Sequence, residues 1–102
     1  MSRSVVRVVL PAPLRALAGA GAEVAVSVSA PVTLRGVLDA VEGAFPSLRG
    51  TMRDHVTHRR RAFVRFYACE ADLSLQSPDV LLPERVVTGD EPLLGVGARA
   101  GG

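Results

Sequence analysis

One segment with helical periodicity stands between segments with the two-residue period of strands, and this order limits the chain to few folds. The apolar residues of 34–45 recur at i, i+3, i+4, i+7 and i+11 on one stripe: Leu34, Val37, Leu38, Val41 and Phe45. Thr33 can cap the start of this helix, and Pro46 ends it. Gly36 and Gly43 each weaken it by up to about 1 kcal/mol, so we expect a helix that depends on packing against a sheet.

Two segments before this helix alternate as strands do. Residues 5–10 are apolar on one face and largely apolar on the other, which favours an internal strand, whereas residues 23–29 place three valines on one face and mainly polar side chains on the other. Between them, residues 11–22 hold two prolines and two glycines, which predicts a connection with one helical turn at residues 14–18.

The second half of the chain has a weaker pattern. Residues 49–61 lack a period and are rich in polar and basic side chains, which predicts a solvated loop or a short helix. Residues 62–70 alternate again as a strand. Residues 73–88 contain two prolines and are expected to form a loop with a short strand or turn near residues 81–87.

A turn at residues 89–92 leads into the last predicted strand, in which Leu94, Val96 and Ala98 are expected to form the row that faces the core. The order of strand, strand, helix, strand, short strand and final strand predicts an α+β fold. We expect one domain, residues 1–102, with a mixed four- to five-stranded sheet packed on one main helix. The first and last strands would pair in parallel.

Composition limits the cellular context and the class of partner. The single cysteine, Cys69, fits a reducing compartment, and no run of apolar residues is long enough for a signal peptide or a membrane span. We therefore expect a cytoplasmic protein without a membrane partner. All 12 basic residues are arginine and the net charge is only +2, a weak indication of nucleic-acid binding.

The run Arg59-Arg60-Arg61, with His55 and His58 nearby, is the most basic segment. Arginines neutralise phosphates, but the run has no interleaved aromatic residues, so we expect no nucleic-acid partner and favour a solvated loop or a contact with an acidic partner. The two histidines, with Asp54 and Cys69, do not have a zinc-site spacing, and no metal site is predicted.

The diglycine Gly101-Gly102 carries the clearest chemical signal. Glycine lacks a Cβ, so two in a row form a thin, flexible segment that can enter a narrow channel and present its carboxylate. ATP can activate such a carboxylate as an acyl adenylate, which a thiol or persulfide then displaces. We therefore expect a flexible tail, residues 98–102, whose reactive product is a thiocarboxylate on Gly102.

Four segments together resemble the MoaD/ThiS family of ubiquitin-like, β-grasp sulfur carriers. They are the opening VVRVVLPAPLRALAG (5–19), the helix from Thr33-Leu34 to Phe45-Pro46, the Gly-Asp-Glu turn (89–91) and the terminal Ala-Gly-Gly (100–102). The approach to the diglycine, Val-Gly-Ala-Arg at 96–99, differs from the Pro-Pro pair of many MoaD-type tails. The length is closer to that of the larger, CysO-type carriers.

The resemblance implies a recyclable co-substrate and not an enzyme. A MoeB- or ThiF-like enzyme would adenylate Gly102 and consume the ATP, while the carrier itself binds no cofactor. A sulfurtransferase or another sulfur source would supply the sulfur. The thiocarboxylate would then feed a biosynthetic enzyme that makes cysteine, thiamine, molybdopterin or another thio-containing metabolite.

Three alternatives remain open at this stage. The chain could be a ubiquitin-like modifier conjugated to lysines through Gly102, the small subunit of molybdopterin synthase, or a binding module whose diglycine has no chemical role. An isopeptide bond at Gly102 would identify the modifier, and a stable complex with a large subunit would identify the synthase.

A partner enzyme needs a surface on which to dock. Phe63, Arg65 and Tyr67 are expected on the outer face of the sheet, joined by Leu93 and Arg99 of the final segment. These residues would form an apolar and basic patch, unless the 49–61 loop or the N-terminus covers it. Arg99 could also steer the tail toward a partner carboxylate, and Gly101 would keep the tail narrow and flexible.

Overall fold

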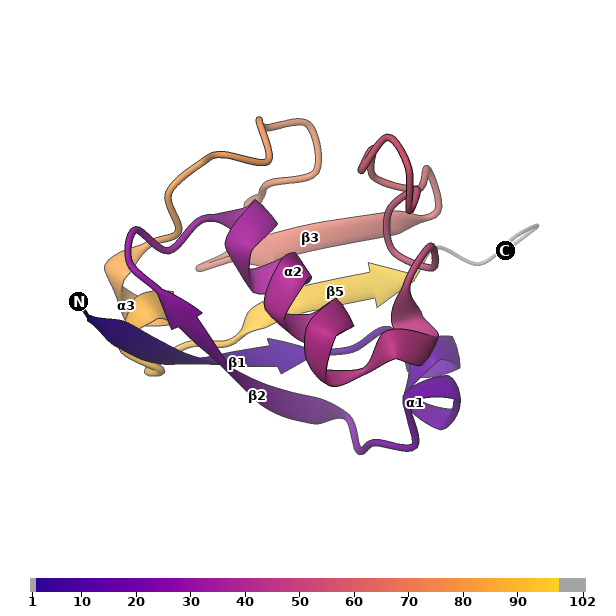
Figure 1. Cartoon of the computed structure of the whole chain (residues 1–102). Helices are drawn as coiled ribbons and strands as arrows, with labels where there is room; N and C mark the ends of the chain where they lie inside the picture. The colour runs from indigo at the N-terminus through magenta and orange to yellow at the C-terminus, as the bar shows by residue number, and fades with distance from the viewer. Residues whose placement is uncertain (1, 98–102) are drawn as a thin grey trace.

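A five-stranded mixed sheet, with strands from both ends of the chain, carries the fold (Figure 1). The computed structural model describes residues 2–97. Strands β1 (Arg3–Val9), β2 (Glu23–Ser29), β3 (Val64–Ala68), β4 (Ala71–Asp72) and β5 (Leu93–Gly97) lie in the order β2-β1-β5-β3-β4. β1 and β5 are parallel, and the other neighbouring strands are antiparallel. The predicted mixed sheet with parallel first and last strands is confirmed.

Helix α2 (Leu34–Ala44) covers one face of the sheet, as its stripe predicts. Four residues of the stripe are buried, and Phe45 packs half-buried against the core. The Thr33 Oγ1 accepts a hydrogen bond from the Gly36 N–H at 3.0 Å and so caps the first turn. The Phe45 N–H closes the helix on the Val41 carbonyl at 2.8 Å, and Pro46 begins a short 3-10 turn, η1 (Pro46–Leu48).

The core lies between α2 and the inner face of the sheet. Alternate residues of β1 and β3 contribute side chains that are at most 1% exposed: Val6, Val8, Val64, Phe66 and Ala68. The valines of β2 complete this layer in the predicted alternation. Burying a side chain of this size stabilises the fold by about 1.5 to 3 kcal/mol, so this layer holds α2 on the sheet.

Helix α1 (Ala12–Ala18) is longer than the single turn predicted at residues 14–18. Proline is tolerated in the first turn of a helix because the N–H it lacks has no intrahelical partner there. Pro11 occupies the N-cap position without a side-chain hydrogen bond and Pro13 lies in the first turn, so the helix begins at the prolines. Gly19, with a φ of 63°, ends it in the left-handed conformation.

Residues 81–87 were predicted as a short strand or a turn, and the strand alternative is wrong because the short fourth strand forms earlier in the chain. The chain reverses at Cys69 and Glu70, whose φ angles are both positive, and returns as β4 beside β3. The usual two-residue hairpin signal is Asn-Gly or Asp-Gly, and Cys-Glu does not provide it. Residues 81–87 instead make one bridge, at Leu81, and a single helical turn, α3 (Glu84–Val87). Within residues 2–97, the helices are too short or too polar to cross a bilayer.

The last strand faces the opposite way from the prediction. Leu93 is fully buried and Gly95 faces the core, whereas Leu94 and Val96 are 36% and 47% exposed. Directly paired residues share a face, and Leu93 pairs with the inward-facing Val8 of β1. Ala98, the third member of the predicted inward row, lies outside the described residues.

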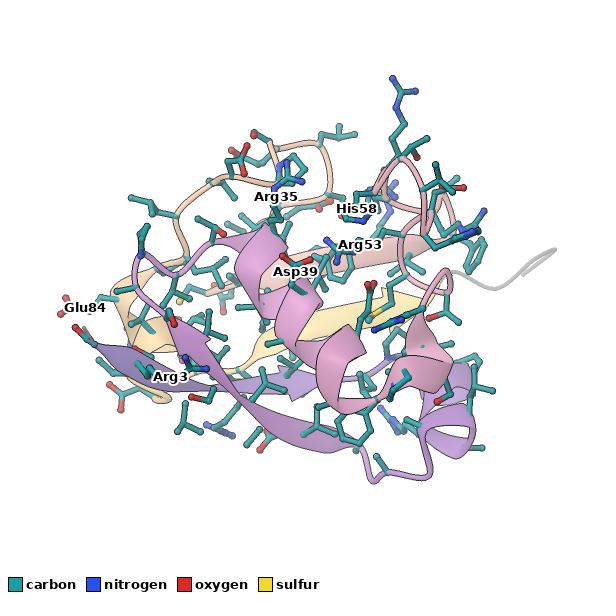
Figure 2. The ribbon with its side chains drawn as sticks, viewed as in Figure 1. Arg3, Arg35, Asp39, Arg53, His58 and Glu84 are labelled. Carbon is teal, nitrogen blue, oxygen red and sulfur yellow. The ribbon has the colours of Figure 1, made fainter. Side chains whose placement is uncertain are left out.

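The 49–61 segment contains no helix, and it is not simply a solvated loop. Met52 is 1% exposed and Arg53 is 3% exposed. The Arg53 guanidinium donates to both carboxylate oxygens of Glu42 on α2, at 2.9 and 3.0 Å, and to the Asp39 carboxylate (Figure 2). Burial opposes the charge of Arg53, yet these hydrogen bonds raise its pKa above the ordinary value. The ion pairs anchor the segment to α2.

Candidate functional site

The residues expected to carry the chemistry lie in the five-residue segment that follows β5 in the sequence. Gly101 and Gly102, together with Arg99, lie outside the described residues. The structure describes the strand that leads to them, which ends at Gly97, five residues before Gly102. The surface around Gly97 is therefore the surface that a partner would meet beside the tail.

An apolar patch occupies the outer face of the sheet, opposite α2. We call it the outer patch and define it by five residues: Val9, Phe63, Tyr67, Leu94 and Val96. The register brings them together, because Leu94 lies opposite both Val9 of β1 and Tyr67 of β3. Phe63 comes directly before β3 and is 54% exposed. Phe63, Leu94 and Val96 are exposed and the other two are half-buried, and such a cluster of accessible apolar side chains is typical of a protein-binding surface.

The outer patch includes two of the predicted docking residues and replaces a third. Phe63 and Tyr67 lie where the alternation of β3 predicts them. Leu93 does not contribute, because it is fully buried in the core. Leu94 and Val96 of the same strand take that place, and they were not predicted there because the alternation of residues 93–98 was assigned the opposite phase. Only the pairing with β1 and β3 determines the phase, since Leu93 and Leu94 are the same residue type.

A groove of about 690 Å³ continues the outer patch toward the end of β5. Leu94, Val96 and Phe63 form one side of it. The other side comes from the start of α1 and the residues before it, including Pro11, Pro13, Leu14 and Arg15. Gly95 and Gly97 line the groove as well, and a Cβ on Gly95 would lie 3.0 Å from the Pro11 Cδ. The missing side chains therefore let α1 approach the strand that leads to the tail.

The charges on this face are largely paired within the chain. Arg65 is exposed opposite Val96, and its Nη1 donates to the Asp72 carboxylate at 3.0 Å. Hydrogen bonds from Ser74 and the nearby Arg65 hold the pKa of Asp72 below its usual value. On β1, Arg7 pairs with Glu23 at 3.0 Å. The predicted basic character of the patch is thus weaker than its apolar character.

The other reactive side chains do not form a site. Cys69 is exposed at the tip of the β3–β4 hairpin. Among residues 2–97, histidine, cysteine and carboxylate side chains do not gather in groups of three or more that could hold a metal ion.

Comparisons with known proteins identify the fold. By sequence, neither a protein-family model nor a curated protein matches the chain. Three solved structures match over nearly the whole length. SAMP1 from Haloferax volcanii has a TM-score of 0.75 at 20% identity and covers 96% of this chain and 99% of its own. The Amycolatopsis orientalis BexX/CysO complex contains a chain with a TM-score of 0.74 at 19% identity, covering 95% and 99%.

The third structure is the small archaeal modifier protein 1 from Methanosarcina acetivorans, with a TM-score of 0.72, 18% identity and full coverage of both chains. These likenesses, together with the mixed sheet on one main helix, confirm the predicted ubiquitin-like β-grasp fold. At such identities the likeness establishes the fold alone.

Proposed function

We propose that this chain, a ubiquitin-like β-grasp protein, is a sulfur carrier that acts through the carboxylate of Gly102. A MoeB- or ThiF-like enzyme adenylates Gly102, a sulfur source converts it to a thiocarboxylate, and a biosynthetic enzyme takes the sulfur. The observation that carries the proposal is the placement of the outer patch and its groove beside Gly97, five residues before Gly102.

The chemistry assigns the catalytic groups to the partners. A Gly102 carboxylate oxygen attacks the α-phosphorus of ATP, pyrophosphate leaves, and an acyl adenylate results. A sulfur nucleophile then attacks the carbonyl carbon, the acyl–sulfur bond forms and AMP departs. Sulfide gives the thiocarboxylate directly, whereas a persulfide gives an acyl disulfide whose S–S bond a second thiol cleaves, forming a disulfide and releasing the thiocarboxylate. The carrier is therefore a co-substrate, and the ATP is bound by the adenylating enzyme. A single cysteine and this partner set fit a cytoplasmic protein.

The outer patch explains how the tail would reach a partner's active site. Five extended residues span about 17 Å, so a partner docked on the outer patch holds Gly102 within a short radius of Gly97. Docking thus makes the attack on ATP effectively intramolecular within the complex. Phe63, Tyr67 and Leu94 supply apolar area for docking, Arg65 lies at the edge of the patch, and Arg99 adds a charge on the tail.

A modifier function is the second candidate, because two of the matching structures are of SAMP1, which one of them names a small archaeal modifier protein. A modifier shares the adenylation step and differs in the nucleophile, which is a lysine of a target protein. The third candidate function is that of the small subunit of molybdopterin synthase, which would use the same tail. It predicts a permanent complex with a large subunit, whereas a recycled carrier dissociates from its acceptor.

The test combines the full chain with ATP and the MoeB- or ThiF-like enzyme of its host, with and without a sulfur source. The carrier proposal predicts pyrophosphate release that depends on the chain, and then exchange of one oxygen for sulfur at Gly102. Intact-mass measurement after alkylation of the thiocarboxylate separates this exchange from oxidation of Met52 or Cys69. A chain without Gly101 and Gly102 is the control. An unaltered carboxylate after treatment with the active enzyme overturns the carrier proposal. If Gly102 is instead found in an isopeptide bond, the carrier proposal is wrong and the modifier function is supported.

A further inference from the structure

The run Arg59-Arg60-Arg61 plays no part in the proposed chemistry, and the structure gives its members different environments. The Arg61 Nε donates to the Gly50 carbonyl at 3.0 Å, and its guanidinium lies 4.0 Å from the Asp54 carboxylate. Arg59 is exposed, and its side chain makes no hydrogen bond to residues 2–97. Arg60 is half-buried. The run is therefore neither a uniform basic stripe nor a freely solvated loop.

Arg60 is held in place without a neutralising carboxylate. Its Nε donates to the Ser74 carbonyl at 2.9 Å, and its Nη1 donates to the carbonyls of Val64 and Arg61 at 2.7 and 3.0 Å. Within residues 2–97, Arg60 has no carboxylate within salt-bridge distance, and its Nη2 has no hydrogen-bond acceptor. A guanidinium that is already immobilised loses little entropy when it binds a carboxylate.

A hollow of about 560 Å³ lies beside this arginine, between the 49–61 segment, α2 and the loop that follows β4. Its cationic lining comprises Arg35, Arg59 and Arg60 beside His58. Figure 2 shows Arg35 and His58 on the same side of α2, above the labelled Arg53 and Asp39. Leu75 and Pro78 add apolar area, and Leu75 is 89% exposed. The hollow thus combines positive charge with an aliphatic contact.

The charge of the hollow is not balanced by the acids around it. Arg35 pairs with Asp79 at 2.8 Å, and that pair holds the pKa of Asp79 below its usual value. Arg53 pairs beneath the hollow with Glu42 and Asp39. Arg53 is a single positive charge between two carboxylates, so Arg59 and Arg60 leave the region with an excess of one positive charge. An occupant with carboxylates complements it.

We propose that this hollow is a second docking surface, which binds an acidic segment of a partner protein that carries an aliphatic residue among its carboxylates. The carboxylates pair with Arg60 and Arg59, and the aliphatic side chain packs on Leu75. Among residues 2–97, the hollow has no Phe, Tyr or Trp in its lining on which a base could stack, and this favours a protein over a nucleic acid. The hollow lies on the α2 side of the sheet, so a partner on the outer patch leaves it open.

The test titrates the isotopically labelled full chain with the peptide Asp-Glu-Leu-Glu-Glu-Asp and follows the backbone amide signals by NMR. We expect saturable shifts of the signals from the 54–60 and 74–79 loops, which weaken as salt is raised. A peptide with Asn and Gln in place of the acids is the control for charge. A thymidine oligonucleotide of equal charge is the control for nucleic acid. The adenylating enzyme is absent, so the result is independent of the proposed function.

Arg59→Glu and Arg85→Glu form a matched pair, because both arginines are exposed and make no side-chain hydrogen bond to residues 2–97. Arg59→Glu is expected to raise the Kd of the acidic peptide by about fivefold or more, while Arg85→Glu leaves it within about twofold. Leu75→Ser is expected to weaken binding without changing its salt dependence. The proposal is overturned if the shifts miss the two loops, if both charge reversals act equally, or if the oligonucleotide binds more tightly than the peptide.

Discussion

Arg53 and Glu42 bury a positive and a negative charge against each other at 2.9 Å, where the Arg53 side chain is 3% exposed and the Glu42 side chain is 11% exposed. Arg53→Ala would leave the Glu42 carboxylate buried without its partner, which typically costs about 3 to 5 kcal/mol. A domain of this size is stable by only about 5 to 15 kcal/mol, so we expect a large loss. Urea unfolding followed by circular dichroism measures it.

Two further variants test the cause of that loss. Arg59→Ala is the control, because an exposed arginine should change the free energy of unfolding by no more than about 0.5 kcal/mol. In the double variant Arg53→Met with Glu42→Leu, the buried charges are gone and part of the stability should return. Equal unfolding midpoints for Arg53→Ala and Arg59→Ala would contradict the anchoring role of Arg53.

Asp54 organises the turn of the 49–61 segment and makes it sensitive to acid. Its carboxylate accepts hydrogen bonds from the Thr57 and Val56 N–H groups at 2.8 Å each, and these hold the pKa of Asp54 below its ordinary value. The unfolded chain therefore binds the proton more readily. The stabilisation is complete above the unfolded pKa of about 3.9 and is lost as the pH falls through the lower folded pKa.

The pH prediction follows from this difference. Asp54→Asn should reduce the free energy of unfolding at about pH 7 and should also lose less of it between about pH 4 and about pH 2 than the wild type does. Urea titrations across this range give both quantities. Parallel curves for the two proteins would show that Asp54 does not contribute to the acid sensitivity.

At the scale of elements, β5 depends on the absence of a side chain at Gly95. A Cβ there would lie 3.0 Å from the Pro11 Cδ and 3.2 Å from the Val9 carbonyl oxygen. Alanine at position 95 would require Pro11 and the Val9 carbonyl to shift by a few tenths of an ångström, and we expect a cost of about 1 to 3 kcal/mol. Gly43→Ala on α2 is the matched control, because a Cβ there meets nothing within 4 Å.

The control has its own expected sign. Alanine at position 43 should stabilise the protein by up to about 1 kcal/mol, since glycine is the poorer helix former. Thermal unfolding of both variants checks the pair of effects. If Gly95→Ala were neutral, the close packing of Pro11 on β5 would not be essential to the groove.

The elements differ in how far local sequence determines them. The apolar stripe of α2 and the valine alternation of β2 predict their elements clearly, because one face of each element is buried. Which face of β5 is buried depends on its pairing with β1 and β3, which are distant in sequence. The glycines of β5 have no side chain and so do not indicate which face is buried. The hairpin at Cys69 lacks a typical turn sequence.

The candidate site shows the same division. Phe63 and Tyr67 follow from the alternation of one strand, and the chemistry of the diglycine follows from its residue types. Leu94, Val96 and the groove required three strands and α1 to be placed together. The burial of Arg53 could not be predicted from its local sequence either. It depends on two carboxylates of α2, eleven and fourteen residues away in the sequence.

For the whole molecule, the fold separates an open sheet face, which carries the outer patch and leads to the tail, from a face covered by α2. A partner that recognises only the diglycine would not respond to changes on the open face. A partner that docks on the outer patch would. Leu94→Asp distinguishes the two, because Leu94 is at the centre of the patch and its exposed side chain can be replaced without a cavity in the core.

We expect Leu94→Asp to lower the kcat/KM for chain-dependent pyrophosphate release by the adenylating enzyme at least tenfold, since a buried charge at an apolar interface costs more than about 1.4 kcal/mol. Leu81→Asp is the matched control: Leu81 is 65% exposed, lies beside Thr33 at the start of α2, and is outside the patch. Its kcat/KM should stay within about twofold of wild type. Circular dichroism must show both variants folded.

If both variants retain the wild-type kcat/KM, recognition resides in the tail alone and the outer patch is not the docking surface. If only Leu94→Asp loses activity, mainly through a higher KM, the partner binds the sheet face before it engages Gly102.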